Sequence, residues 1–148
     1  MNNSNNRSLE KIGGLYSSLP TPFLESGELD ERTFEKNVEK MSEVGVDGIY
    51  ITESTGEFFA LDMEEFKKVV DIFSRVTDKT DIDRQVGCTS ENMDFTLEKI
   101  NYVSEKGIET VHVTFPYWLP LRDEEIKGFF KKIYSSCPEM NIIHYNTG

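Results

Sequence analysis

Three short stretches carry side chains suited to ligand binding and proton transfer, and the first of them is TESTGE, Thr52–Glu57. Ser54 and Thr55 place two hydroxyls side by side, and Gly56 allows the backbone to turn sharply. Adjacent hydroxyls and the free N–H groups of such a turn suit a small carboxylate or phosphate. A turn that only caps the following helix uses the same residue types, so composition alone leaves both interpretations open.

The other two stretches carry aromatic residues. FPYWLP, Phe115–Pro120, displays Tyr117 and Trp118 on a loop stiffened by two prolines. Such a loop indicates a pocket wall, a subunit contact or ordinary packing beneath it. NIIHYNTG, Asn141–Gly148, places Tyr145 just after an apolar run. A tyrosine at the end of a parallel strand can carry a proton in a site, or it can lie buried with its hydroxyl satisfied.

Composition excludes several classes of protein. The chain has 148 residues, which suits one domain, and its net charge of −11 argues against a nucleic-acid partner, because phosphate binding needs a basic face. Cys88 and Cys137 form no CxxC pair, and His112 and His144 show no metal-ligand spacing. We therefore expect free thiols, structural histidines and no metal. The sequence shows neither a secretory signal nor an apolar run of about 18 residues, so we expect a cytoplasmic protein without a membrane span.

The apolar pattern alternates between two periods, and this alternation predicts the elements that position these residues. Short apolar runs predict strands over residues 14–19, 48–52, 84–88, 110–115 and 141–146. Helical spacing predicts helices over residues 30–44, 61–76, 90–107 and 122–137. Val44 is expected on the apolar face of the first helix, and Asp62 is expected to cap the second with Glu65 as its capping-box partner. The β-α-β-α-β-α-β-α-β order predicts a parallel sheet covered by helices.

Two architectures fit this order. A doubly wound, flavodoxin-like sheet of five strands would be complete at this length. A (β/α)8 barrel, which needs about 250 residues, would be a little over half built. The sequence holds no GxGxxG and no GxxxxGK[ST] phosphate loop, which weakens a nucleotide-binding interpretation. In both architectures ligands bind at the carboxyl ends of the strands, where the three stretches lie.

Together the motifs resemble those of the dihydrodipicolinate synthase and N-acetylneuraminate lyase family. ESTGE is similar to that family's G-[ST]-T-G-E turn, and TPF, GVDGIYI, VGCTS, VTFPYW and YNTG occur in the family's order over residues 12–148. The resemblance implies a (β/α)8 TIM barrel, of which residues 12–148 supply the first five strands and four helices after a flexible polar segment, residues 1–11. It therefore implies an N-terminal portion of a longer reading frame.

The resemblance also implies a chemistry. The family's members are class I, pyruvate-dependent lyases and synthases, which form a Schiff base between a lysine and a 2-oxo acid and use no metal or other cofactor. Ser54 and Thr55 would bind the carboxylate of pyruvate, and Ser54 would also join a proton relay. Tyr145 would be the central proton donor and acceptor, and Tyr117 and Trp118 would line the substrate site. An aldehyde would be the second substrate, and the complete protein would be a homo-oligomer, a dimer or tetramer.

Two substitutions depart from the family's pattern. Glu53 replaces the first glycine of the turn, which sets a carboxylate beside a carboxylate site. Trp118 stands where synthase members carry a second tyrosine. An indole N–H can donate a hydrogen bond but cannot shuttle a proton as a phenol can. This change favours a divergent aldolase relative over a strict dihydrodipicolinate synthase.

The third departure concerns the imine lysine. In the family it lies on the sixth strand, roughly one βα unit beyond the YN motif. Lys127, Lys131 and Lys132 fall on the fourth expected helix and cannot replace it. We therefore expect this chain alone to be inactive and to associate through open sheet edges. A non-catalytic half-barrel that acts by self-association and a flavodoxin-like binding domain are the alternatives.

Overall fold

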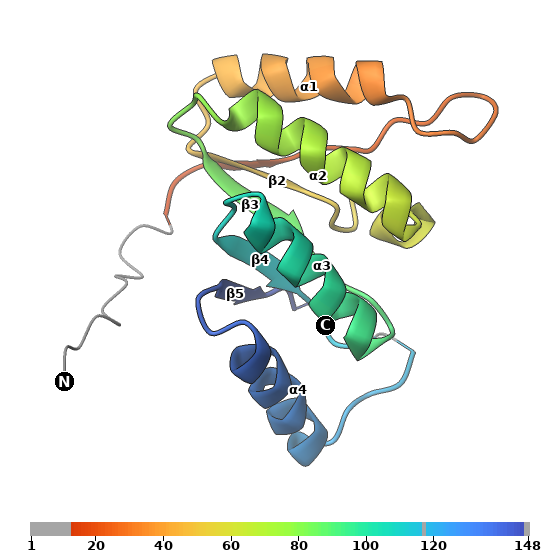
Figure 1. The fold of residues 1–148 in the computed structure, drawn as a ribbon, viewed down its shortest axis with the longest axis vertical. Coiled ribbons are helices and arrows are strands. Elements are labelled where there is room, and N and C mark those ends of the chain that lie inside the picture. The colour runs from red at the N-terminus through yellow and green to blue at the C-terminus, as the bar shows by residue number, and fades with distance from the viewer. Residues whose placement is uncertain (1–12, 117, 147–148) are drawn as a thin grey trace.

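The computed structural model describes residues 13–116 and 118–146, which form one parallel sheet with helices packed along it (Figure 1). The elements over these residues are, in order, β1 (Tyr16–Ser18), α1 (Glu31–Glu43), β2 (Gly48–Ile51), η2 (Phe58–Ala60), α2 (Met63–Thr77), β3 (Asp83–Gly87), α3 (Met93–Glu105), β4 (Thr110–Val113), α4 (Asp123–Ser136) and β5 (Asn141–His144). All nine expected strands and helices are confirmed. Four of the five strands are shorter than predicted, because the chain leaves the sheet where the polar loops begin. The flexible segment expected over residues 1–11 lies outside the described residues.

The order of the strands decides between the two architectures. Within the described residues the strands lie in the order β1-β2-β3-β4-β5, and each pairs in parallel with the next one along the chain. A doubly wound sheet reverses its strand order near the middle and places helices on both faces. The flavodoxin-like alternative is therefore wrong. A sheet in which every strand lies beside its predecessor is the arrangement of a (β/α)8 barrel.

The outer face of the sheet makes the hydrophobic core with the helices. Figure 1 shows α1, α2, α3 and α4 following one another along the strands. The strand residues that point to the helices are fully buried: Ile49, Ile51, Val86, Val111 and Val113. The helices contribute buried side chains to the same core, each at most 7 % exposed: Phe34, Val38, Phe66, Val69, Val70, Phe73, Ile100, Val103, Phe129 and Ile133. Burial of one such side chain contributes about 1.5–3 kcal/mol, so this contact fixes the sheet against its helices.

The opposite, inner face of the sheet is polar. Strand alternation and register place Tyr16, Tyr50, Asp83, Gln85, His112 and Asn141 on it. The Tyr16 hydroxyl donates to Asp83 Oδ2 at 2.6 Å, and Gln85 Nε2 donates to the same oxygen at 3.0 Å. Polar groups inside a fold need such partners, since an unmade hydrogen bond there is costly. The inner face is therefore a connected polar surface below the candidate site.

Local signals set where the helices begin and end. The capping box at α2 is confirmed: Asp62 Oδ1 accepts from the Glu65 N–H at 2.8 Å, and Glu65 Oε2 accepts from the Asp62 N–H at 3.1 Å. The expectation for Val44 is wrong. The helix α1 ends at Glu43, and Val44 is its C-cap residue with 59 % of its surface exposed. Gly45 then turns the chain with a φ of 84°, a conformation that favours glycine.

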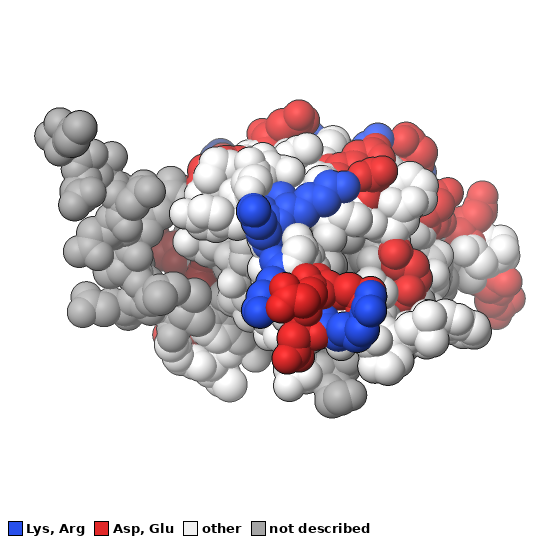
Figure 2. Space-filling view, turned by 90° about the horizontal axis from the view of Figure 1, so that it is seen from below, with Lys and Arg blue, Asp and Glu red and all other residues white. Residues whose placement is uncertain are grey.

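The outer surface around α4 carries charges of both signs. Figure 2, which views the molecule from below Figure 1, shows Lys and Arg side chains interleaved with Asp and Glu. Lys127 Nζ lies 2.8 Å from Glu124, and Lys132 Nζ lies 3.2 Å from Asp94 of α3. These two lysines are thus ion-paired on the outside of the helix, on the side of the sheet away from its polar inner face.

Candidate active site

The turn that carries the two hydroxyls is wound tightly after β2. Thr52 is fully buried with a φ of 56°, which is a strained conformation for a β-branched residue. Its Oγ1 lies 2.8 Å from the carbonyl oxygens of both Ile51 and Gly87. A Cβ at Gly56 would lie 2.7 Å from the Thr52 nitrogen, so only glycine fits there. Thr21 Oγ1 donates to the Gly56 carbonyl at 2.7 Å. The hydrogen bonds of Thr21 and Thr52 therefore fix the conformation of the turn.

The turn presents Ser54 and Thr55 at the carboxyl end of β2, and both are exposed. The Glu57 N–H donates to the Ser54 carbonyl at 3.2 Å and closes the turn. Tyr145 follows β5, and its N–H donates to the Val113 carbonyl at 2.9 Å. This places the Tyr145 hydroxyl 3.5 Å from Ser54 Oγ. Three of the residues selected from the sequence, two of them in contact, are therefore brought to one end of the sheet.

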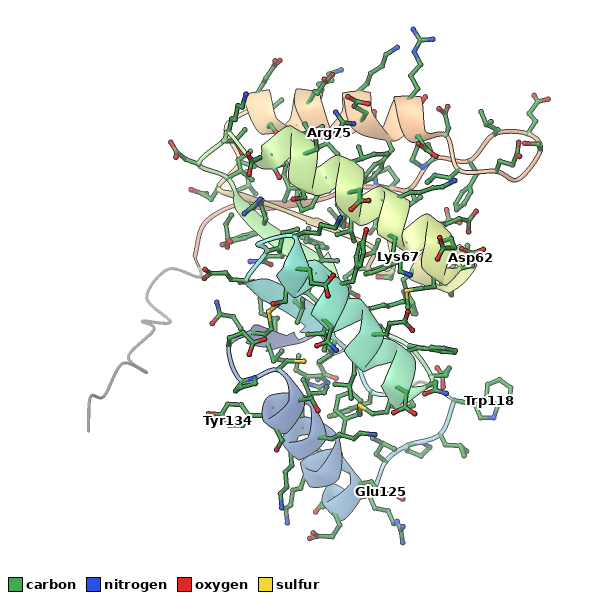
Figure 3. The ribbon with its side chains drawn as sticks, in the orientation of Figure 1. Asp62, Lys67, Arg75, Trp118, Glu125 and Tyr134 are labelled. Carbon is green, nitrogen blue, oxygen red and sulfur yellow. The ribbon has the colours of Figure 1, made fainter. Side chains whose placement is uncertain are left out.

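The aromatic loop after β4 contributes less to this arrangement. Tyr117 lies outside the described residues. Trp118 is 81 % exposed, and Figure 3 shows its ring projecting away from the body of the molecule. The packing beneath the loop is made by Phe115, whose ring centroid lies 4.2 Å from that of His144 and 5.5 Å from that of Phe129. The structure thus exposes Trp118 and packs the His144 ring against Phe115.

His112 belongs to the floor of the site, a position that the sequence did not reveal. Its ring lies between those of Tyr50, at 5.3 Å and 30°, and Tyr145, at 6.5 Å and 14°. His112 Nε2 lies 2.6 Å from Gln85 Oε1, an amide oxygen that only accepts, so Nε2 carries the proton. Burial lowers the pKa of His112 to about 4, with Asp83 acting weakly in the opposite direction. His112 is therefore a neutral ring that supports Tyr145 from the inner face.

Glu53 turns inward, although it stands beside the two exposed hydroxyls. It is 1 % exposed, and its Oε1 lies 3.9 Å from His112 Nδ1. A Cβ at position 87 would lie 2.7 Å from Glu53 Oε1, so Gly87 leaves the space that this carboxyl fills. Burial raises the pKa of Glu53 to about 7, and the positive charge of Lys99 opposes this shift. The carboxylate expected beside the site is thus a buried group that titrates near neutral pH.

Lys99 is the second buried charged residue near the turn. Its Nζ donates to the Thr89 carbonyl at 3.1 Å and lies 5.0 Å from the centroid of the Phe66 ring. Burial lowers the pKa of this amine. Thr89 Oγ1 in turn accepts from the Thr114 N–H at 3.1 Å. Lys99 therefore ties α3 to the segment after β3, and Thr89 ties that segment to the one after β4.

No group of three or more His, Cys, Asp or Glu side chains in residues 13–116 and 118–146 is placed to hold a metal ion. None of the helices in the same ranges is long and apolar enough to cross a membrane.

Comparison with known proteins places this geometry in a family. The family model described as the Dihydrodipicolinate synthetase family matches residues 11–148. The chain is 31 % identical over 133 residues to the 4-hydroxy-tetrahydrodipicolinate synthase of Methanothrix thermoacetophila, an alignment that covers 90 % of this chain and 44 % of that protein. The chain thus spans about half the length of the curated relatives that it matches.

Solved structures agree with this result. The N-acetylneuraminate lyase of Mycoplasma synoviae superposes with a TM-score of 0.86 at 26 % identity, over 94 % of this chain and 48 % of that one. YagE, a prophage protein of the dihydrodipicolinic acid synthase family from E. coli K12 solved in complex with pyruvate, superposes with a TM-score of 0.84 at 23 % identity, over 91 % and 45 %. The strand order, the ESTGE turn and the family match lead to one conclusion: the chain belongs to the dihydrodipicolinate synthetase family.

Proposed function

We propose that Ser54, Thr55 and Tyr145 form the 2-oxo acid site of a class I lyase or aldolase that makes or breaks a bond to pyruvate or a close analogue. The observation that carries the proposal is the 3.5 Å separation of the Ser54 and Tyr145 hydroxyls at the carboxyl ends of two parallel strands. Active sites of (β/α)8 barrels lie at this end. Family membership supports the choice of substrate, since the E. coli family member was solved with pyruvate.

The turn supplies the carboxylate site. Ser54 and Thr55 are exposed, and their hydroxyls can donate to the two oxygens of a carboxylate. Hydrogen bonds to a charged group contribute about 1.5–3 kcal/mol each. The strained and buried Thr52 and the required Gly56 hold the turn in one conformation. A rigid turn orients the substrate's carboxylate and therefore its neighbouring keto carbon.

Tyr145 is the proton carrier of the proposed reaction. The amine of a lysine adds to the keto carbon, and the resulting carbinolamine loses water after its hydroxyl accepts a proton from Tyr145. The imine then withdraws electrons from the methyl carbon, which can lose a proton and attack an aldehyde. A phenol suits these steps because it can give and regain a proton. Ser54, 3.5 Å from the phenol oxygen, is placed to pass that proton on.

The intact natural protein that carries residues 1–148 supplies the other parts of the proposed reaction. Its imine lysine comes from outside these residues, as the family resemblance implies. Its second substrate is an aldehyde, and we propose a homo-oligomer in the cytoplasm. The tryptophan at position 118 favours a divergent aldolase relative over a strict dihydrodipicolinate synthase. The alternative of a non-catalytic half-barrel acting by self-association is distinguished by the experiment below.

Hydrogen exchange at pyruvate tests the function without knowledge of the aldehyde. Imine formation makes the methyl protons of pyruvate exchange with solvent, so the methyl signal disappears in D2O. We expect the intact protein to catalyse this loss in proton NMR spectra. A Ser54→Ala/Thr55→Ala double variant, which lacks both carboxylate-binding hydroxyls, should exchange the protons far more slowly. Exchange at the background rate with the wild-type protein would contradict the proposed function and favour the non-catalytic alternative.

A further inference from the structure

Glu53 and His112 face each other with two unpaired atoms. Glu53 Oε1 and His112 Nδ1 are both buried, and neither has a hydrogen-bond partner in the described structure. The two atoms lie 3.9 Å apart. The exposed fractions of the two residues are only 1 % and 6 %, so neither atom can turn to solvent without moving the turn or the strand. Two neighbouring buried polar atoms without hydrogen-bond partners are unusual, since buried polar side chains nearly always have a partner.

The protonation of the ring determines how these atoms can be satisfied. Because His112 Nε2 donates to Gln85 Oε1, the neutral ring leaves Nδ1 as an acceptor. An ionised Glu53 is also only an acceptor, so it would leave both atoms unpaired. A protonated Glu53 can donate to Nδ1. An ordinary hydrogen bond between these atoms requires the 3.9 Å gap to close by about 1 Å.

We propose that Glu53 and His112 share one proton between Glu53 Oε1 and His112 Nδ1, and that this pair keeps the neighbouring carboxylate-binding turn free of a buried negative charge. The space for the pair is built into the sheet, because Gly87 lies opposite His112 in the strand register and leaves room for the carboxyl. The tyrosine rings on either side of His112 hold the imidazole in place. Glu53 and His112 are positioning residues, since neither touches the substrate in this proposal.

The consequence for the site rests on the proposed function. Glu53 directly precedes Ser54 and Thr55, so an ionised Glu53 would place a negative charge beside the substrate's carboxylate, and in a buried position this repulsion is only weakly screened. The protonated pair carries no net charge. The 2-oxo acid would therefore bind best while the pair holds its proton.

The charged groups around Glu53 act in both directions. Lys99 of α3 favours the ionised carboxyl, whereas burial favours the neutral one and has the larger effect. Cys88, which directly follows β3, is buried, and burial holds the pKa of its thiol far above the usual range, so it stays uncharged. Asp83 acts on His112 from the far side of Gln85 and favours a charged ring, but burial of the imidazole outweighs it. Together these groups place the loss of the shared proton near neutral pH, on Glu53.

Nitrogen NMR of the imidazole tests the pair independently of any activity. In the 15N-labelled intact protein, the spectrum of a His112→Phe variant, which keeps a ring in the stack, identifies the His112 signals. At pH 6 we expect a neutral ring with its proton on Nε2 and with Nδ1 accepting a hydrogen bond. The Nδ1 signal should shift as the pH rises through about 7, when Glu53 loses its proton.

A Glu53→Gln variant is the matched control, because its amide can still donate to Nδ1 but cannot ionise. Its Nδ1 signal should keep the position of a hydrogen-bonded acceptor and stay constant from pH 6 to pH 9. A wild-type Nδ1 signal that is equally constant over this range would overturn the proposal. So would a ring that is charged at pH 6 or that carries its proton on Nδ1.

Substrate kinetics test the consequence. The KM for pyruvate of the wild-type protein should rise about tenfold or more between pH 6 and pH 9, whereas that of Glu53→Gln should stay constant. A KM that rises equally in both proteins would overturn the role of the pair at the carboxylate site. If the protein shows no exchange or turnover of pyruvate, the proposed function fails, and the NMR result still decides whether the proton is shared.

Discussion

The hydroxyls of Ser54 and Tyr145 lie 3.5 Å apart although 91 residues separate them in the chain. Ser54 follows β2 and Tyr145 follows β5. Their relative position is set by the register of three parallel strand pairs, β2–β3, β3–β4 and β4–β5. The stacked rings of Tyr50, His112 and Tyr145 cross the same inner face. The relative position of the two hydroxyls is therefore a property of the whole sheet.

Removal of the Tyr145 hydroxyl tests its role as proton carrier. Tyr145→Phe should keep the fold, because the ring that stacks on His112 remains, and should lower kcat about 10²-fold or more, the usual scale for a general acid–base group. Tyr134→Phe is the control, since Tyr134 is 65 % exposed on α4 (Figure 3). Turnover by Tyr145→Phe at the rate of this control would show that the phenol transfers no proton.

Replacement of the Thr55 hydroxyl tests the carboxylate site. Thr55→Val keeps the shape of the side chain but cannot donate, and loss of one charge-assisted hydrogen bond of about 1.5–3 kcal/mol should raise the KM for pyruvate at least several-fold. Thr55→Ser restores the hydroxyl and should recover most of the affinity. An effect confined to the KM of the aldehyde would mean that the turn binds the other substrate.

Glu53 makes the stability of the fold depend on pH. Its pKa in the folded state, about 7, lies above the ordinary 4.5, so the folded state holds this proton more tightly than the unfolded state. The stability from Glu53 is therefore fully present below pH 4.5 and is lost as the pH rises through about 7. Relative to Glu53→Gln, the wild-type free energy of unfolding should fall by about 3 kcal/mol over this interval.

The comparison with Glu53→Gln separates this effect from that of His112. The pKa of His112 is lowered by burial, so its contribution has the opposite sign: it is present above the ordinary pKa of 6.5 and is lost as the pH falls through about 4. Below pH 6.5 the amide of Glu53→Gln donates to His112 Nδ1 as the protonated carboxyl of Glu53 does, so this contribution is similar in both proteins and largely cancels in the difference. Denaturant unfolding at several pH values measures the difference in the free energy of unfolding between the wild type and Glu53→Gln. A difference that does not change with pH would show that Glu53 titrates normally.

The capping box of α2 gives a prediction for stability alone. Asp62→Ala removes the side chain that accepts from the Glu65 N–H and should cost about 1 kcal/mol in the free energy of unfolding. Asp78→Ala, at the other end of the same helix, should be neutral or slightly stabilising, because an acid at a helix C-terminus opposes the helix dipole. Equal losses in the two variants would mean that the cap adds nothing.

The order of the elements could be predicted from the sequence because it depends on local patterns. Apolar spacing and caps such as Asp62 identify each helix with only its neighbours in the chain. The choice between a barrel and a doubly wound sheet could not be made in this way. It depends on which strands lie side by side, and both architectures use the same alternation of strands and helices.

The residues of the candidate site also differ in whether local sequence patterns reveal them. Ser54, Thr55 and Tyr145 were found because each lies in a motif just after an apolar run. No sequence motif indicates that Glu53 lies near His112. Their proximity depends on the space that Gly87 leaves and on the inward orientation of the Glu53 side chain. A buried pair with one residue in the turn after β2 and the other on β4 becomes visible only when the register of these strands is known.

Reductive trapping tests whether this family member binds a 2-oxo acid as an imine. The intact protein is incubated with pyruvate and borohydride, and its mass and peptide map are measured. We expect one reduced pyruvate adduct per chain, on a lysine outside residues 1–148, and a much slower reaction in Ser54→Ala/Thr55→Ala. Absence of an adduct, or an adduct on one of the lysines of residues 1–148, would contradict this expectation.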